Sequence, residues 1–159
     1  MDISTQRSRR ADADMLRRFV LAILIMGIVG TGAELVLLEH MEDFWQWVPL
    51  VLFVAALPCA GWLLVAPGVV SVRIFQIVMV LFVVSGFVGQ WLHYKGNVEF
   101  ELEMYPSRGG LELVWEALGG ATPSLAPGTM TLLGLLGLAV CFRHPDLSSA
   151  GKRNSQEER

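Results

Sequence analysis

Acidic and imidazole side chains stand near the ends of long apolar segments, where they could handle protons or bind a metal ion. Glu34 lies inside the first apolar run, six residues before His40. An ionisable side chain at such a depth in a membrane is costly and rarely faces lipid, which makes Glu34 the best single candidate for proton or cation chemistry. Gly27, Gly30 and Thr31 share its helical stripe, and small residues on one stripe allow a neighbouring helix to approach closely.

Another apolar run carries a similar stripe that ends in a histidine. Gly86, Gly89 and His93 share this stripe, and Gln90 lies beside it. If the two stripes pack together, Glu34, Gln90 and His93 form a polar cluster beneath the outer rim. This cluster has two interpretations: a protonated glutamate hydrogen-bonded to Gln90 or to a backbone carbonyl, or a site that handles protons or cations.

Two histidines and a nearby aspartate suggest metal ligands at the same rim. His40 and Asp43 are three residues apart, and His93 ends its apolar run at a similar depth. Zinc, iron and manganese accept imidazole and carboxylate ligands. The sequence contains neither a Glu-x-x-His pair nor an HExxH motif, so no known metal pattern is present. A divalent metal at His40, His93 and Asp43 is therefore an alternative to a solvated rim, and no other cofactor is predicted.

The elements that must position these residues are membrane-spanning helices. The chain is 53% hydrophobic and only 17% charged over 159 residues. A spanning helix needs about 20 mostly apolar residues. The sequence predicts an all-α membrane protein, a bundle of four transmembrane helices, with spans at 19–38, 47–65, 69–92 and 125–142.

Basic residues flank these spans on one side only, which predicts the orientation. With four crossings, both termini are cytoplasmic and the loops rich in carboxylates lie outside, in a multi-pass protein of the cell (plasma or inner) membrane. The arginines on the cytoplasmic side include Arg17, Arg18, Arg73 and Arg143. The predicted extracytoplasmic acidic face consists of Glu39, Glu42, Glu99, Glu101 and Glu103.

One transmembrane domain with two tails accounts for the whole chain. Residues 1–18 form a basic cytoplasmic tail, residues 19–143 the four-helix domain and residues 144–159 a polar cytoplasmic tail. The domain includes an extracytoplasmic loop at 94–124. The basic start followed by an apolar run and GTGA also resembles a cleavable signal peptide, but the apolar character resumes beyond Glu34, which favours a retained span.

The outer loop contains two patterned segments. In NVEFELEMYP (97–106), apolar and acidic residues alternate, which predicts a short strand-like segment that either caps the bundle or pairs with a second copy or a partner. In 109–120, apolar residues recur at helical spacing between paired glycines. This pattern predicts an amphipathic helix lying flat at the outer interface. Its apolar stripe is Leu111, Val114, Trp115 and Leu118.

The stretches AELVLLEHMEDFWQWVPL, HYKGNVEFELEMYP and FRHP resemble those of small, uncharacterised bacterial integral membrane proteins with four spans. The resemblance covers most of the chain. It implies a membrane location and brings no activity, cofactor or site residues.

Three functions are compatible with these features. The first is a non-enzymatic membrane component or accessory subunit, in contact with the lipid bilayer and with a membrane protein partner or copies of itself. The second is a metal- or quinone-linked membrane oxidoreductase, and the third is a proton- or cation-coupled transporter that uses Glu34. The sequence favours the first, because it has no nucleophile constellation, and it shows no pattern for binding nucleic acid.

Overall fold

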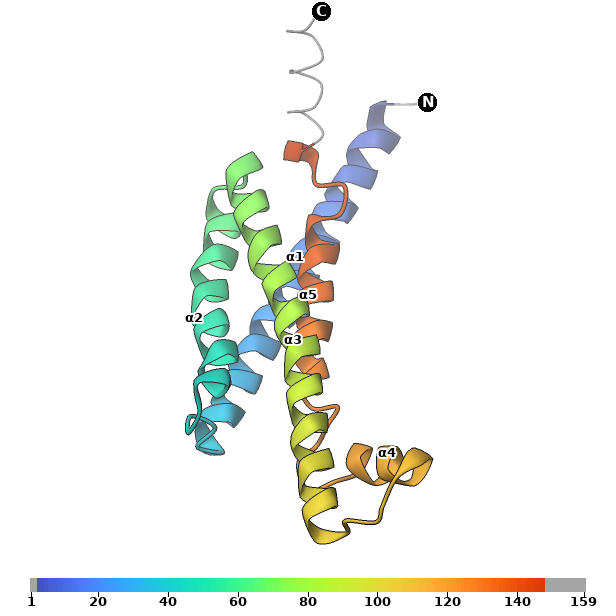
Figure 1. The fold of residues 1–159 in the computed structure, drawn as a ribbon. Helices are drawn as coiled ribbons and strands as arrows, with labels where there is room; N and C mark the ends of the chain where they lie inside the picture. Colours follow the sequence, from blue (N-terminus) through green and yellow to red (C-terminus); the bar gives the residue numbers. More distant parts are fainter. Residues whose placement is uncertain (1–2, 148–159) are drawn as a thin grey trace, which may run out of the picture.

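The computed structural model describes residues 3–147, and all regular elements in that range are helices. Along the chain these are α1 (Ile3–Leu37), α2 (Phe44–Val65), α3 (Val69–Met104), α4 (Gly110–Leu118) and α5 (Gly128–Cys141). The helices α1, α2, α3 and α5 run along one another, while α4 crosses the lower part of α3 (Figure 1). The predicted all-helical class is confirmed for the described residues.

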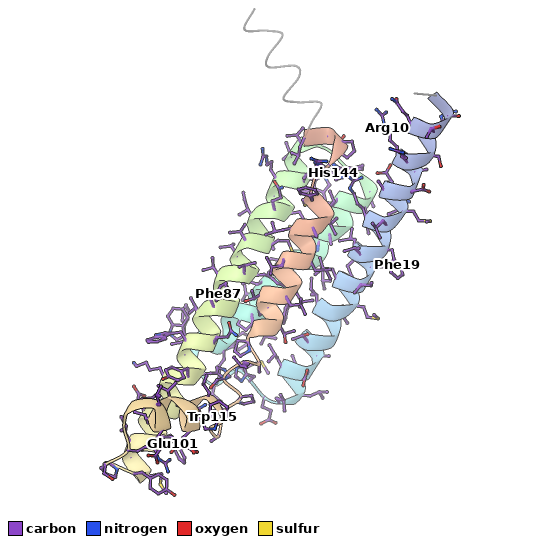
Figure 2. The ribbon with its side chains drawn as sticks, turned by 90° about the vertical axis from the view of Figure 1, so that its right-hand side faces the viewer. Arg10, Phe19, Phe87, Glu101, Trp115 and His144 are labelled. Carbon is purple, nitrogen blue, oxygen red and sulfur yellow. The ribbon has the colours of Figure 1, made fainter. Side chains whose placement is uncertain are left out.

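Three of the helices, α1, α2 and α3, are long and apolar enough to cross a membrane. Their most apolar windows have mean hydropathies of 2.3, 2.3 and 2.2. Large apolar side chains such as Phe19 and Phe87 project outward from the middle of the bundle, as expected for a surface that meets lipid (Figure 2). The predicted fourth span is not confirmed, because α5 has only 14 residues and rises about 21 Å.

The two ends of the bundle differ in composition. The first turns of α1 lie at the same end as the last turn of α5, and α4 lies at the opposite end (Figure 1). Arg17 on α1 confirms the first proximity, since its Nη2 donates to the carbonyl oxygen of Arg143 at 3.1 Å. We call these the arginine end and the cap end. Residues 3–18 of the predicted tail are helical and continuous with α1, whereas 1–2 and 148–159 lie outside the described residues.

Glycines bring α3 and α5 into the most extensive packing of the bundle. A Cβ on Gly134 would lie 2.7 Å from the carbonyl oxygen of Met79 and 2.9 Å from the backbone nitrogen of Val83. A Cβ on Gly86 would lie 2.6 Å from the backbone nitrogen of Thr131. Only glycine permits backbones to approach this closely. The small-residue stripe predicted on span three therefore packs against α5, and not against the stripe on α1.

The prediction of a strand-like segment at 97–106 is wrong, because α3 continues as a helix to Met104. With 36 residues, α3 rises about 54 Å and exceeds a hydrocarbon core of about 30 Å. Glutamate, leucine and methionine are good helix formers, and Lys95 pairs with Glu99 one turn later at 3.5 Å. A lone strand would have no ladder partner. The helix ends where Pro106 follows Tyr105, because proline disfavours helical geometry in the residue before it.

Candidate functional site

The way in which α1 ends positions His40 at the cap end. Glu39 adopts a left-handed conformation with φ of 52°, and the backbone N–H of His40 donates to the carbonyl oxygen of Leu35 at 3.0 Å. Such bonds satisfy carbonyls that a helix terminus would leave without partners. The indole N–H of Trp47 donates to the carbonyl oxygen of Met41 at 3.1 Å and fastens the turn to α2.

The two predicted imidazole ligands come together in this region. The ring centroids of His40 and His93 are 6.2 Å apart, and the planes are tilted by 43°. The Nδ1 atom of His93 is buried and has no hydrogen-bond partner. An imidazole nitrogen in this condition could bind a cation or a polar ligand. Metal binding at this histidine pair stays a prediction.

Asp43, the third predicted ligand, is engaged as the N-cap of α2. Its carboxylate accepts a hydrogen bond from the backbone N–H of Phe44 at 2.6 Å, and the side chain of Gln46 accepts one from the backbone N–H of Asp43 at 3.3 Å. Asp43 and Gln46 also form a capping box, in which the side chain of each accepts from the backbone N–H of the other. Within residues 3–147, no group of three or more His, Cys, Asp or Glu side chains is placed to hold a metal ion.

The structure does not bring Glu34 to Gln90 and His93. Glu34 is exposed on α1 and forms no hydrogen bond or ion pair with the described residues. Gln90 faces the start of α5, because its Nε2 would lie 3.1 Å from a Cβ on Gly128. The inclination of α1 explains the difference (Figure 1). The helix contacts α5 at Gly27 but has diverged by Gly30, beside which a Cβ would meet open space.

A buried asparagine fastens the region that we call the cap, residues 97–124. Asn97 is only 2% exposed. Its amide nitrogen, which carries two hydrogens, lies within hydrogen-bond distance of three acceptors: the carbonyl oxygens of Thr122 at 2.7 Å and Ala117 at 2.9 Å and the hydroxyl of Ser124 at 2.9 Å. Its amide oxygen accepts from the backbone N–H of Thr122 at 3.0 Å and from the hydroxyl of the same residue at 2.7 Å. One side chain thus joins α3, the end of α4 and the loop to α5.

An arginine makes the second connection within the cap. The guanidinium of Arg108 pairs with the buried carboxylate of Glu101 and donates through Nε to Glu112 at 3.2 Å. It also stacks over the ring of Tyr105, with 4.2 Å between the guanidinium carbon and the ring centroid. Figure 2 shows Glu101 and Trp115 at this end of the molecule. These contacts fix the turn between α3 and α4, because Arg108 in the turn binds one carboxylate from each of the two helices.

With its inner side fastened, α4 presents apolar side chains outward. Ala117 is fully buried against α3, whereas Leu111 is 87% exposed and Trp115 is 75% exposed. Val114 and Leu118 are also exposed. The predicted amphipathic helix is confirmed as a helix, and its apolar stripe is not covered by the described residues. We call Leu111, Val114, Trp115 and Leu118 the α4 stripe.

Four members of the predicted acidic face are exposed and one is not. Glu39, Glu42, Glu99 and Glu103 are exposed, whereas Glu101 is buried against Arg108. The sequence alone did not identify the residues that fasten the cap, which are Asn97, Arg108, Thr122 and Ser124. A lone asparagine just beyond an apolar run was the one available signal, because its partners lie 20 or more residues away.

His144, at the arginine end, makes the stability of the fold depend on pH. Burial lowers the pKa of His144 below its ordinary value of 6.5, and Arg17 adds to this, while Asp146 and Asp14 oppose it. The fold therefore favours the neutral imidazole, and this contribution is complete above pH 6.5 and is lost as the pH falls below it. We expect the unfolding midpoint in detergent to drop between about pH 7.5 and about pH 5.5. The drop is smaller in His144→Gln, which has no imidazole to protonate. If the midpoint falls equally with pH in the two proteins, His144 is not the group responsible.

No protein-family model, curated protein or solved structure matches this chain.

Proposed function

We propose that this chain is a non-enzymatic membrane component, an accessory subunit that holds a membrane protein partner through its cap. The observation that supports this is an apolar stripe displayed on a fastened helix. Burying Leu111 and Trp115 against a partner would contribute roughly 2 kcal/mol or more for each side chain. The ordering cost of binding is reduced because Asn97 and Arg108 already hold α4 in place.

The charges of the cap indicate the kind of partner. Glu99, Glu103, Glu112 and Glu116 are all exposed around the end of α3 and α4. A partner segment with basic residues beside apolar or aromatic ones would complement this surface. Arg18, Arg73 and Arg143 are exposed toward the opposite end, which supports a cytoplasmic arginine end and an extracytoplasmic cap.

Purification from native membranes tests this function. The full chain, in mild detergent, is expected to retain one partner at fixed stoichiometry. The double variant Leu111→Ser/Trp115→Ser loses that partner, because polar side chains cannot replace the buried apolar area. The matched control is Trp45→Ser, which changes another exposed tryptophan side chain, on α2. The proposal would be refuted if the double variant still retained the partner, or if the wild type retained no partner at fixed stoichiometry.

Lipid is the competing cover for the α4 stripe, and fluorescence separates the two cases. In vesicles with brominated phospholipids, a tryptophan in the lipid layer loses its emission. The contribution of Trp115 is obtained as the difference between wild type and Trp115→Phe. We expect it to be quenched much less than the remaining emission, and equal quenching would show that lipid covers the stripe.

A second candidate function is cation binding at the histidine pair. The supporting observation is the unpartnered, buried Nδ1 of His93 beside His40. A metal held there would be the basis of a metal-linked oxidoreductase. Elemental analysis of the purified protein should then find zinc, iron or manganese near one equivalent, lost in His93→Ala and kept in His144→Ala. Substoichiometric metal that is indifferent to both substitutions would exclude this candidate.

A further inference from the structure

The arginine end contains a cavity of about 250 Å³ between α1, the end of α2 and the residues that follow α5. Its floor is apolar and includes Leu21, Leu63 and Val140, all of them buried. Its rim is charged and includes Arg18 and Asp146. The cavity therefore combines an apolar interior with ionic groups at its rim. The rim lies at the level where the first apolar run begins, which is the position of a bilayer boundary.

Part of the rim is already neutralised by internal contacts. The guanidinium of Arg17 pairs with the carboxylate of Asp14 at 2.9 Å. Its other terminal nitrogen donates to the carbonyl oxygens of Arg143 and Phe142 at the end of α5, at 3.1 and 3.5 Å. Arg17 therefore joins α1 to α5 and balances Asp14, which leaves neither charge free for a ligand.

Two opposite charges on the rim have no such compensation. Arg18 forms no hydrogen bond or ion pair with the described residues. Among the described residues, the ion-pair contact of Asp146 is with His144, with 3.3 Å between Nδ1 and Oδ2 and no hydrogen-bond geometry. Because burial lowers the pKa of His144, the imidazole is mainly neutral at pH 7 and does not balance the carboxylate. One guanidinium and one carboxylate thus remain available on a single cavity.

Such a pair complements a zwitterion better than it complements an anion or a cation. A guanidinium binds the oxygens of a phosphate through parallel N–H donors, and a carboxylate accepts from an ammonium group. A purely anionic headgroup would meet the uncompensated carboxylate of Asp146. A quaternary ammonium has no N–H to donate and is usually held by the rings of Trp, Tyr or Phe, and none of these three residue types is among the described residues that line this cavity.

We propose that this cavity binds a phosphate ester bearing a primary ammonium group, the headgroup chemistry of phosphatidylethanolamine. Arg18 binds the phosphate and Asp146 accepts from the ammonium, while the apolar floor takes the glycerol and the start of the acyl chains. The site lies at the opposite end from the cap and does not depend on the function proposed for the cap.

Native mass spectrometry of the full chain tests this site. The protein in detergent is offered equal amounts of phosphatidylethanolamine, phosphatidylcholine and phosphatidylglycerol with identical acyl chains. We expect the ethanolamine lipid to be retained about tenfold more than either competitor. Arg18→Gln reduces its retention to the level of the choline lipid. Asp146→Asn abolishes the preference and favours the glycerol lipid, because the remaining charge is positive.

The matched control is Arg73→Gln, an exposed arginine at the same end that borders a different cavity. It should leave the preference unchanged. Equal retention of the three lipids by wild type, or a preference that survives both Arg18→Gln and Asp146→Asn, would overturn the proposal. An equal loss in the Arg73→Gln control would also overturn it, since charge alone would then explain binding.

Soluble phosphoethanolamine distinguishes the two sources of this headgroup. If an excess of it displaces the lipid from wild type, the polar groups alone recognise the ester and a soluble ligand is admitted. If the lipid stays bound, the apolar floor contributes and the site belongs to a membrane lipid. Both results support the chemistry of the site, whereas failure of both compounds to bind would refute it.

Discussion

Gly134→Ala is expected to destabilise this protein strongly, although it adds only one methyl group. The new Cβ would stand 2.7 Å from the carbonyl oxygen of Met79 and 2.9 Å from the backbone nitrogen of Val83. Backbone atoms cannot rotate away, so α5 must separate from α3 along its length. We expect a destabilisation of about 3 kcal/mol, measured as a lower midpoint of thermal unfolding by circular dichroism in detergent.

Glycines in open surroundings provide the control for this prediction. A Cβ on Gly30 in α1 or on Gly61 in α2 would meet no atom within 4 Å. Gly30→Ala and Gly61→Ala should therefore keep or raise the midpoint, because alanine is about 1 kcal/mol better than glycine inside a helix. If Gly134→Ala behaves like these two variants, α3 and α5 do not pack as described.

Asn97→Leu is expected to release the cap from the rest of α3. The substitution removes five hydrogen-bond contacts made by one buried side chain. It leaves the carbonyl oxygen of Thr122 without the amide donor, and the carbonyl oxygen of Ala117 with only the hydroxyl of Ser124 at 3.0 Å. A buried polar group that loses its partner costs about 1–3 kcal/mol. Hydrogen exchange followed by mass spectrometry should show loss of protection over 110–124, with protection of α2 retained.

The neighbouring residue Lys95 supplies the control for this second prediction. Its amine is exposed and, among residues 3–147, pairs only with Glu99 across one helical turn, at 3.5 Å. Lys95→Ala should leave the protection of 110–124 unchanged, because such exposed pairs contribute little. If protection of 110–124 persists in Asn97→Leu, the attachment of α4 must depend mainly on Ala117 packing and on Arg108.

Several features follow from the sequence because they depend on neighbouring residues alone. An apolar run of about 20 residues predicts a membrane helix whatever surrounds it, and three such runs became α1, α2 and α3. The helical spacing of Leu111, Trp115 and Leu118 likewise identified α4. His40 and His93 were expected at one level because each follows an apolar run, and their ring centroids do lie within 6.2 Å of each other.

Tertiary structure decided the features that depend on how helices are rotated and inclined. The alternation in 97–106 is compatible with a strand, but without a partner strand the segment continues α3, and the chain folds back through Asn97 and Arg108 to cover it. The direction of Glu34 was fixed in the same way. A stripe of small residues indicates that another helix can pack closely against it. The inclination of α1 determines where its contact with α5 ends, and this contact ends before Glu34. Helix rotation depends on contacts from distant segments, which no local pattern contains.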